Sequence, residues 1–276
     1  MLYEAHEISV PYAAAGIRGT GHPVVYAYVR DRSREMAVPP RPALLICPGG
    51  AYSFTSDREA EPIALEFLRR GFQCFVLRYS TAESTVFPGA LLETAAAVVW
   101  IREHAEEWNM DPHAVMVCGF SAGGHLAASL GVFWDKEFVN GPLSTSGEQI
   151  RPDGLILGYP VITSGEFRHQ VSFECLLGER YEEPGLLELV SLEHQVSEQM
   201  PPAFLWHTWD DGGVPVENSL LFASALRTHG IPFEMHILPS GSHGMSLGTA
   251  ETGMISEACS PWVDWAERWV RSLPKR

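Results

Sequence analysis

Short apolar runs alternate with segments of helical periodicity along most of this 276-residue chain. Strand-like runs lie at 43–47, 72–77, 115–118, 155–157, 203–206 and 233–238, and the clearest helical segment extends from about Pro88 to Trp108. Runs that are apolar throughout predict strands buried on both faces. The alternation therefore predicts an α/β fold with a mostly parallel central sheet and helices on both of its faces. Sites in such sheets lie at the carboxyl ends of the strands.

The length of the chain favours one folded unit. With 276 residues, of which 46% are hydrophobic, the chain can bury a large core, and α/β folds of this size commonly form one domain. We therefore expect a single domain over 1–276. The stretch from about 133 to 202 interrupts the rhythm, because it is long, irregular and contains Gly141-Pro142 and Pro184-Gly185. Part of it is expected to form a small lid-like insertion.

Composition argues against several classes of partner. The formal net charge is −15 and the pI is about 5.1, so nucleic acid and anionic membrane surfaces would be repelled. No apolar run reaches the roughly 20 residues needed to span a bilayer. Residues 1–10 carry acidic side chains where a secretion signal would be basic and then apolar. Three cysteines, Cys47, Cys74 and Cys118, lie in strand-like runs, as expected of buried free thiols in a reducing compartment. The acidic N-terminus and these cysteines together predict a cytoplasmic location.

A glycine-flanked serine follows the run 115–118. The sequence Gly119-Phe120-Ser121-Ala122-Gly123 leads directly into the helix-forming run 126–130. Glycines two residues on either side of the serine allow a strand-to-helix turn so tight that side chains there would collide with neighbouring backbone. Such a turn places the Ser121 hydroxyl at a helix N-terminus, where developing negative charge is favoured. In this context the motif predicts a nucleophile, whereas the alternative is a serine that merely caps the helix.

Two later loops offer a base and an acid. In the α/β-hydrolase fold the serine is followed along the chain by Asp or Glu and then by His, each in a loop after a strand. His243 lies in a glycine-containing loop after the run 233–238 and is predicted to be the general base. Asp210 and Asp211 follow the run 203–206, and their spacing does not distinguish which one is the acid.

Other histidines are weaker candidates for the base. His125 would point along its helix into packing, and His229 has the position of a residue at a helix C-terminus. His207 lies beside the acid loop, where it clusters with Asp210 and Asp211 in a way that could suggest a metal site. Because no His-Glu-x-x-His or comparable ligand pair is present, we expect no metal.

A second glycine-rich turn follows the run 43–47. Glycines in Pro48-Gly49-Gly50-Ala51-Tyr52 would let backbone N–H groups approach a developing oxyanion. Gly50 and Ala51 are the predicted donors, and the N–H of Ala122, directly after the nucleophile, is the third. Pro-Gly-Gly by itself is an ordinary turn, so this prediction depends on its position after a strand.

Taken together, these motifs resemble the compact α/β-hydrolase esterases similar to acetylxylan esterases and other polysaccharide-deacetylating carbohydrate esterases. The resemblance covers most of the chain, from 47–50 through 53–59, 76–80 and 119–126 to the two C-terminal loops. It implies that Asp211, rather than Asp210, is the acid that accompanies Ser121 and His243, and that no cofactor is required. Relatives often carry a third glycine where this chain has Ala51.

The resemblance implies that the chain deacetylates xylo-oligosaccharides or related acetylated sugars through an acyl-enzyme. Tyr52 and Trp209 are candidates to stack on a sugar ring. The same triad could act on lipid esters, on small amides such as formamides or on peptides, and the fold could also serve as a catalytically silent binding module. The tryptophans of 262–269 recur at helical spacing and are expected to form a packing face.

Overall fold

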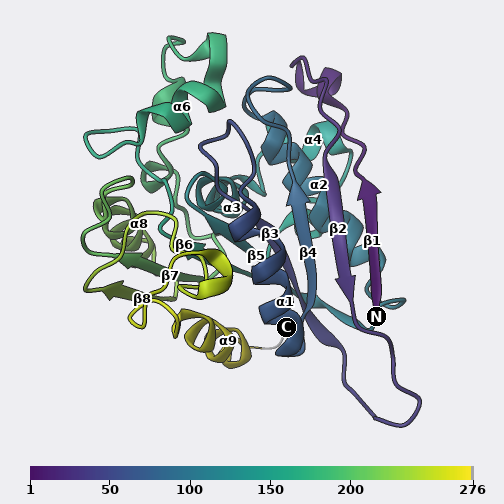
Figure 1. Ribbon diagram of the computed structural model, residues 1–276. Coiled ribbons are helices and arrows are strands. Elements are labelled where there is room, and N and C mark those ends of the chain that lie inside the picture. The colour runs from purple at the N-terminus through teal and green to yellow at the C-terminus, as the bar shows by residue number, and fades with distance from the viewer. Residues whose placement is uncertain (275–276) are drawn as a thin grey trace.

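A single twisted sheet organises the structure, a computed structural model that describes residues 1–274 (Figure 1). Within that range the sheet has eight strands in the order β1-β2-β4-β3-β5-β6-β7-β8. From β4 to β8 in this order all neighbours are parallel, whereas β1 pairs with β2, and β2 with β4, in antiparallel register. The prediction of a mostly parallel sheet in an α/β fold is therefore confirmed.

The predicted strand-like runs correspond to the parallel strands. The strands are β1 Leu2–Glu7, β2 Val24–Val29, β3 Arg41–Cys47, β4 Gln73–Arg78, β5 Met110–Phe120, β6 Gly154–Gly158, β7 Ala203–Thr208 and β8 Phe233–Leu238. Strands β1 and β2 were not predicted from the sequence. For β1 the reason is physical, because it lies at the sheet edge with most of its side chains exposed and has no continuous apolar run.

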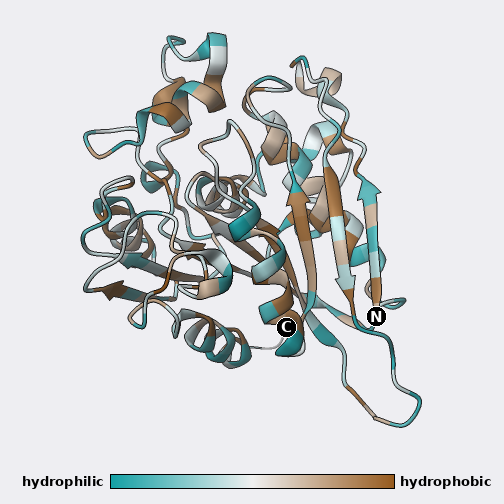
Figure 2. Ribbon diagram, viewed as in Figure 1, coloured by the Kyte–Doolittle hydropathy of each residue, from teal (hydrophilic) through white to brown (hydrophobic). Residues whose placement is uncertain are grey.

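Helices cover both faces of the sheet, as predicted. One face packs against α1 (Glu61–Arg69) and α9 (Trp262–Ser272), and the other against α2 (Gly89–Glu103), α3 (Ala122–Phe133) and α8 (Glu217–Thr228). Successive side chains of β3 and β5 enter the two cores alternately over 43–47 and 115–118, so these parts of the strands are apolar throughout. Figure 2 shows the result as hydrophobic colour on the central strands, in contrast to the largely hydrophilic strand β1.

The stretch 133–202 is more varied than the lid that the sequence suggests. It is divided by β6, which lies between β5 and β7 in the sheet. Before β6, α4 (Glu137–Leu143) and α5 (Gly147–Ile150) pack against α2, so this half is part of the body of the molecule. After β6 come α6 (Gln170–Leu177), α7 (Leu186–Leu189) and the short 3₁₀ helix η4 (Leu192–His194). A lid-like insertion stays a prediction, for the part that follows β6.

The cysteines have the predicted environment. All five are free thiols, and Cys47, Cys74 and Cys118 are buried within β3, β4 and β5. Among residues 1–274 there is no helix with the length and apolar character needed to cross a membrane.

The C-terminal tryptophans form the expected packing face on α9. Trp262 is completely buried, and its ring stacks on that of Trp206 at a centroid distance of 5.3 Å. Its indole N–H also donates to the carbonyl oxygen of Ser246 at 2.8 Å. Trp269 is buried as well, and Trp265 stacks on His236 at 4.3 Å. Helix α9 therefore joins one core of the sheet to the loop that follows β8.

We predict that Trp262→Ala lowers the free energy of unfolding by about 3–5 kcal/mol, because it leaves a large cavity and an unpaired Ser246 carbonyl. Urea denaturation followed by circular dichroism measures the change. Trp209→Ala is the matched control, since this tryptophan is 67% exposed and its removal creates no cavity. Equal losses in the two variants would contradict the assignment of Trp262 to the core.

Candidate active site

Ser121 lies at the sharp turn between β5 and α3. Its backbone has φ +54° and ψ −121°, a positive-φ conformation that a non-glycine residue adopts only when its surroundings impose it. The glycines on either side make the turn possible, as the sequence predicts. A Cβ atom at Gly119 would lie 2.0 Å from the Gly123 carbonyl oxygen, and one at Gly123 would lie 2.1 Å from the Cys47 carbonyl oxygen. The turn can therefore hold Ser121 in this position only because Gly119 and Gly123 lack side chains.

Three side chains from separate loops form a continuous hydrogen-bonded chain at the carboxyl end of the sheet. The Oγ atom of Ser121 is 2.8 Å from Nε2 of His243, and Nδ1 of His243 is 2.8 Å from Oδ2 of Asp211. Ser121 follows β5, Asp211 follows β7 and His243 follows β8. The serine and the aspartate are buried, whereas the histidine side chain is 27% exposed. The predicted nucleophile, acid and base are thus within reach of one another and of solvent.

Asp211 is held in place on both of its oxygens. Oδ1 accepts the backbone N–H groups of Gly213 at 2.8 Å and Val214 at 2.9 Å, while Oδ2 faces His243. Burial disfavours the charged form, but hydrogen bonds from His207 and His243 hold the pKa of Asp211 well below its usual range. The carboxylate therefore stays ionised beside the imidazole.

Two glycines, Gly212 and Gly213, follow Asp211, and the second of them is required for steric reasons. A Cβ atom at Gly213 would lie 2.8 Å from Cβ of His243, so a side chain there would displace the imidazole. Asp210, the alternative acid, points elsewhere, because its Oδ1 accepts the backbone N–H of Gly241 at 2.8 Å. The structure therefore places Asp211 against His243 and Asp210 as a tie between the two loops.

The second glycine-rich turn lies beside Ser121, after β3. Gly50 has φ +126°, and a Cβ atom there would lie 2.2 Å from the Phe54 carbonyl oxygen. Ala51 adopts φ +53° in spite of its side chain. In residues 1–274 the N–H groups of Gly50 and Ala51 donate no hydrogen bond within the protein. Together with the N–H of Ala122 at the start of α3, they are available to a ligand.

Tyr52 has a different place from the one that the sequence suggests. Its side chain is buried, and its hydroxyl lies 2.9 Å from Nδ1 of His125, whose Nε2 lies 2.9 Å from the Val190 carbonyl oxygen. Because Nε2 must donate to that carbonyl, Nδ1 accepts the proton of the Tyr52 hydroxyl. The expectation that Tyr52 stacks on a sugar ring is corrected, because the turn folds its ring into the core. Instead, Tyr52 and His125 join the turn to the segment after β6.

Trp209 remains accessible. It follows β7 directly, its backbone N–H donates to the Leu238 carbonyl oxygen at 2.8 Å, and its side chain is 67% exposed. A rigid backbone position and an open indole face are what an aromatic platform for a sugar requires.

Two buried polar residues at the site are missed by the sequence analysis as contributors. His207 is completely buried, with Nε2 at 3.5 Å from Oδ2 of Asp211. Its presence within an otherwise apolar strand run is a signal that could have identified it. Glu59 is also buried, and its Oε2 accepts the N–H of Gly49 at 2.8 Å. No local pattern distinguishes Glu59, since acidic residues before a helix are usually exposed caps. Among the described residues, no group of three or more His, Cys, Asp or Glu side chains is arranged to hold a metal ion.

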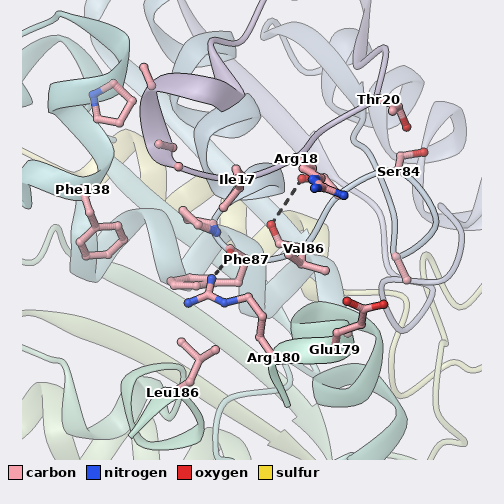
Figure 3. A pocket seen from close by; sticks show the side chains of 18 of the residues that line it. Ile17, Arg18, Thr20, Ser84, Val86, Phe87, Phe138, Glu179, Arg180 and Leu186 are labelled. Atoms are coloured by element: carbon pink, nitrogen blue, oxygen red, sulfur yellow. Dashed lines mark hydrogen bonds between the residues drawn. The ribbon is translucent and has the colours of Figure 1, made fainter. Parts of the chain in front are cut away.

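A cavity of about 1200 Å³ lies apart from these residues (Figure 3). Its wall includes residues 14–18, 82–88 and 178–180, and none of the three hydrogen-bonded side chains belongs to it. Arg180 closes one side by donating to the Phe87 carbonyl oxygen at 2.9 Å. This cavity therefore does not form a binding site around Ser121.

Comparison with known proteins gives the relationship of the chain. Residues 33–226, a range that includes Ser121 and Asp211, match the family described as BD-FAE. The chain belongs to the BD-FAE family.

Relatives of this BD-FAE member include two curated proteins from bacteria. It is 40% identical over 234 residues to endo-1,4-beta-xylanase B from Butyrivibrio fibrisolvens, a match that covers 83% of this chain and 35% of that protein. It is 33% identical over 245 residues to an acetylxylan esterase from Xylanibacter ruminicola, covering 84% and 46% respectively. The chain thus spans only about a third to a half of the length of these two relatives.

Solved structures show the same fold over nearly the whole chain. An acetyl ester-xyloside bifunctional hydrolase from Caldicellulosiruptor lactoaceticus has a TM-score of 0.80 at 38% identity, covering 92% of this chain and 89% of that one. The carboxylesterase Cest-2923 from Lactobacillus plantarum WCFS1 has a TM-score of 0.83 at 26% identity, covering 98% and 97%. The BD-FAE member described here therefore has the α/β-hydrolase fold.

We predict that His125 makes stability depend on pH. Burial lowers its pKa from 6.5 to about 4. Between these values the unfolded state binds more protons than the folded state, so the free energy of unfolding falls as the pH falls, by up to about 1.4 kcal/mol per pH unit. Urea denaturation at several pH values between 6.5 and 4 measures this slope.

His125→Gln provides the control for that experiment. Glu59 and Glu93 are buried carboxyls whose pKa values burial raises, and they oppose the effect of His125 in both proteins. The difference between the variant and the wild type therefore isolates the histidine. If the two proteins lost stability in parallel, His125 would not be the neutral buried group described here.

Proposed function

We propose that this BD-FAE member is a serine carboxylesterase that removes acetyl groups from acetylated xylo-oligosaccharides or related sugars. The observation that carries the proposal is the hydrogen-bonded chain from Ser121 through His243 to Asp211, with 2.8 Å at each step. Esterases and an acetylxylan esterase among the relatives support the reaction class. The buried free thiols fit a reducing compartment, and a cytoplasmic location remains a prediction.

The first half of the reaction forms an acyl-enzyme. The Ser121 oxygen attacks the ester carbonyl carbon while Nε2 of His243 takes its proton. The carbonyl oxygen becomes an oxyanion that the N–H groups of Gly50, Ala51 and Ala122 are placed to stabilise. Asp211 remains ionised and favours the imidazolium. Collapse of the intermediate breaks the ester bond, and His243 donates its proton to the departing sugar oxygen, which leaves as a hydroxyl.

The second half reverses these roles with water as the nucleophile. His243 takes a proton from water, hydroxide adds to the acetyl carbon, and the Ser121 oxygen leaves with the proton that His243 returns. The products are free enzyme and acetic acid, which releases its proton to solvent and becomes acetate. His243 carries each proton that moves to or from Ser121.

The choice of an acetylated sugar rests on similarity and on one surface feature. An acetylxylan esterase and an acetyl ester-xyloside hydrolase are among the similar proteins, and Trp209 offers an exposed indole beside the acid loop. Lipid esters, formamides and peptides remain alternative substrates for the same triad. A catalytically silent binding module is disfavoured, because it would have no need for a strained serine in contact with a paired imidazole.

The first prediction of this proposal is that Ser121→Ala lowers the rate of acetate ester hydrolysis by at least about 10³-fold. A chromogenic acetate ester and acetate release from acetylated xylo-oligosaccharides are measured with the same protein. Ser224→Ala, on the exposed face of α8, is the control and should retain full activity. If the wild type hydrolysed neither substrate, the proposed esterase activity would be wrong. If it cleaved only the chromogenic ester, the proposed acetylated-sugar substrate would be wrong.

The second prediction separates the two neighbouring aspartates. Asp211→Asn should lower kcat on the order of 10³–10⁴-fold, because an amide cannot hold His243 in the required tautomer or stabilise its cation. Asp210→Asn should cost less than about tenfold, since an amide oxygen can still accept the Gly241 N–H. Steady-state kinetics on the chromogenic ester gives the ranking. The reverse order would make Asp210 the acid.

A further inference from the structure

Glu59 is a buried carboxylate whose environment accounts for both of its oxygens. It ends the 3₁₀ helix η2 (Asp57–Glu59), and its side chain is enclosed. Oε2 accepts the N–H of Gly49 at 2.8 Å, and Oε1 accepts the hydroxyl proton of Tyr159 at 2.7 Å. Burying a carboxylate is costly unless its acceptor sites are satisfied. Two donors of this quality offset part of that cost and define where the carboxylate lies.

The two donors belong to different parts of the site. Gly49 begins the turn that presents the N–H groups of Gly50 and Ala51. Tyr159 directly follows β6, and its hydroxyl oxygen accepts the N–H of Ser246 at 2.9 Å, three residues after His243. A single carboxylate thus connects the oxyanion turn with the loop that carries the base.

Glu59 and its donor Tyr159 also lie close to Ser121 and His243. A Cβ atom at Gly49 would lie 2.6 Å from Oε2 of Glu59 and 3.0 Å from Cβ of Ser121, so the space there, beside both the carboxylate and the serine, is too small even for a methyl group. The Tyr159 ring meets the His243 ring edge-on at a centroid distance of 5.1 Å. Glu59 therefore lies close to the nucleophile and is linked to the base through Tyr159.

We propose that Glu59 is a positioning residue that aligns the oxyanion turn with the His243 loop and provides a second negative charge behind the imidazolium. This inference rests on the proposed esterase function and goes beyond it, because Glu59 touches neither the substrate nor the proton that is transferred. A shift of the turn relative to Ser121 by a fraction of an ångström would misplace the oxyanion donors.

The charged and titratable groups around His243 come from several loops. Asp211 contacts Nδ1 directly, and His169, before α6, interacts with the imidazole electrostatically. Arg58 lies next to Gly244, with its guanidinium 3.3 Å from the position of a Cβ there, and opposes the effect of Glu59. Removing the Glu59 charge while leaving the others in place should therefore make the imidazolium easier to deprotonate.

The test is Glu59→Gln, which keeps the shape of the side chain and removes its charge. We expect kcat for the chromogenic acetate ester to fall roughly 10- to 100-fold with KM within about twofold. The acidic limb of the pH profile of kcat/KM should move to lower pH by about half a unit. Rates are divided by the concentration of active sites, measured with a phosphonate that labels Ser121, so partial unfolding does not count as lost catalysis.

Two further variants complete the experiment. Glu61→Gln, an exposed glutamate two residues away, is the matched control and should leave kcat and the pH profile unchanged. Tyr159→Phe keeps the ring against His243 but removes the hydroxyl between Glu59 and Ser246, so it should also lower kcat.

The results distinguish this inference from the proposed function. A wild type without esterase activity would overturn the function itself. An active wild type, together with a Glu59→Gln variant of normal kcat per active site or of unshifted pH profile, would overturn only the role of Glu59.

Discussion

The close approach of β3 and β5 at their carboxyl ends is the constraint on which the site depends. Gly123 packs so tightly on the Cys47 carbonyl that a Cβ atom would lie 2.1 Å from it. This contact, between the first turn of α3 and the end of β3, keeps the turn after β3 directly beside the turn after β5, where Ser121 has a positive φ. The nucleophile and the N–H groups of Gly50 and Ala51 are neighbours because β3 and β5 pair in parallel and because glycine lets α3 start against the end of β3.

Buried polar side chains then hold the loops that the strands deliver. Asp211 is fixed by backbone N–H groups on one oxygen, His125 by bonds at both ring nitrogens, and Glu59 by donors from two separate loops. Asp211 is thus held within its own loop, whereas His125 and Glu59 are hydrogen-bonded to segments distant in sequence, and in each case the bonds offset the cost of burial. Order in the site is thus produced by interactions that lie beneath it, while the His243 side chain remains partly exposed.

Local patterns account for much of the fold. The strand-like runs and the helix near 88–108 are readable because buried strands need continuous apolar residues and helices need a periodic face. The edge strand β1 cannot be predicted in this way, since it has few buried side chains and therefore no continuous apolar run. The position of the Tyr52 side chain cannot be predicted from local sequence either. An aromatic residue beside a glycine turn can point outward or inward, and here the hydrogen bond to His125 beneath the turn holds it inward.

What the sequence determined by itself is the set of reactive groups and their order along the chain: a serine between spaced glycines, then an aspartate, then a histidine, each after a strand. Those signals are local, because tight turns and strand ends are encoded by neighbouring residues. Spacing left open which aspartate meets the histidine, and the family resemblance implied Asp211. Only the tertiary structure put Asp211 against His243 and decided which buried residues support the pair. Asp211 and His243 are 32 residues apart, and Glu59 and Tyr159 are 100 apart. Contacts across such separations depend on how the strands pair, which no local pattern records.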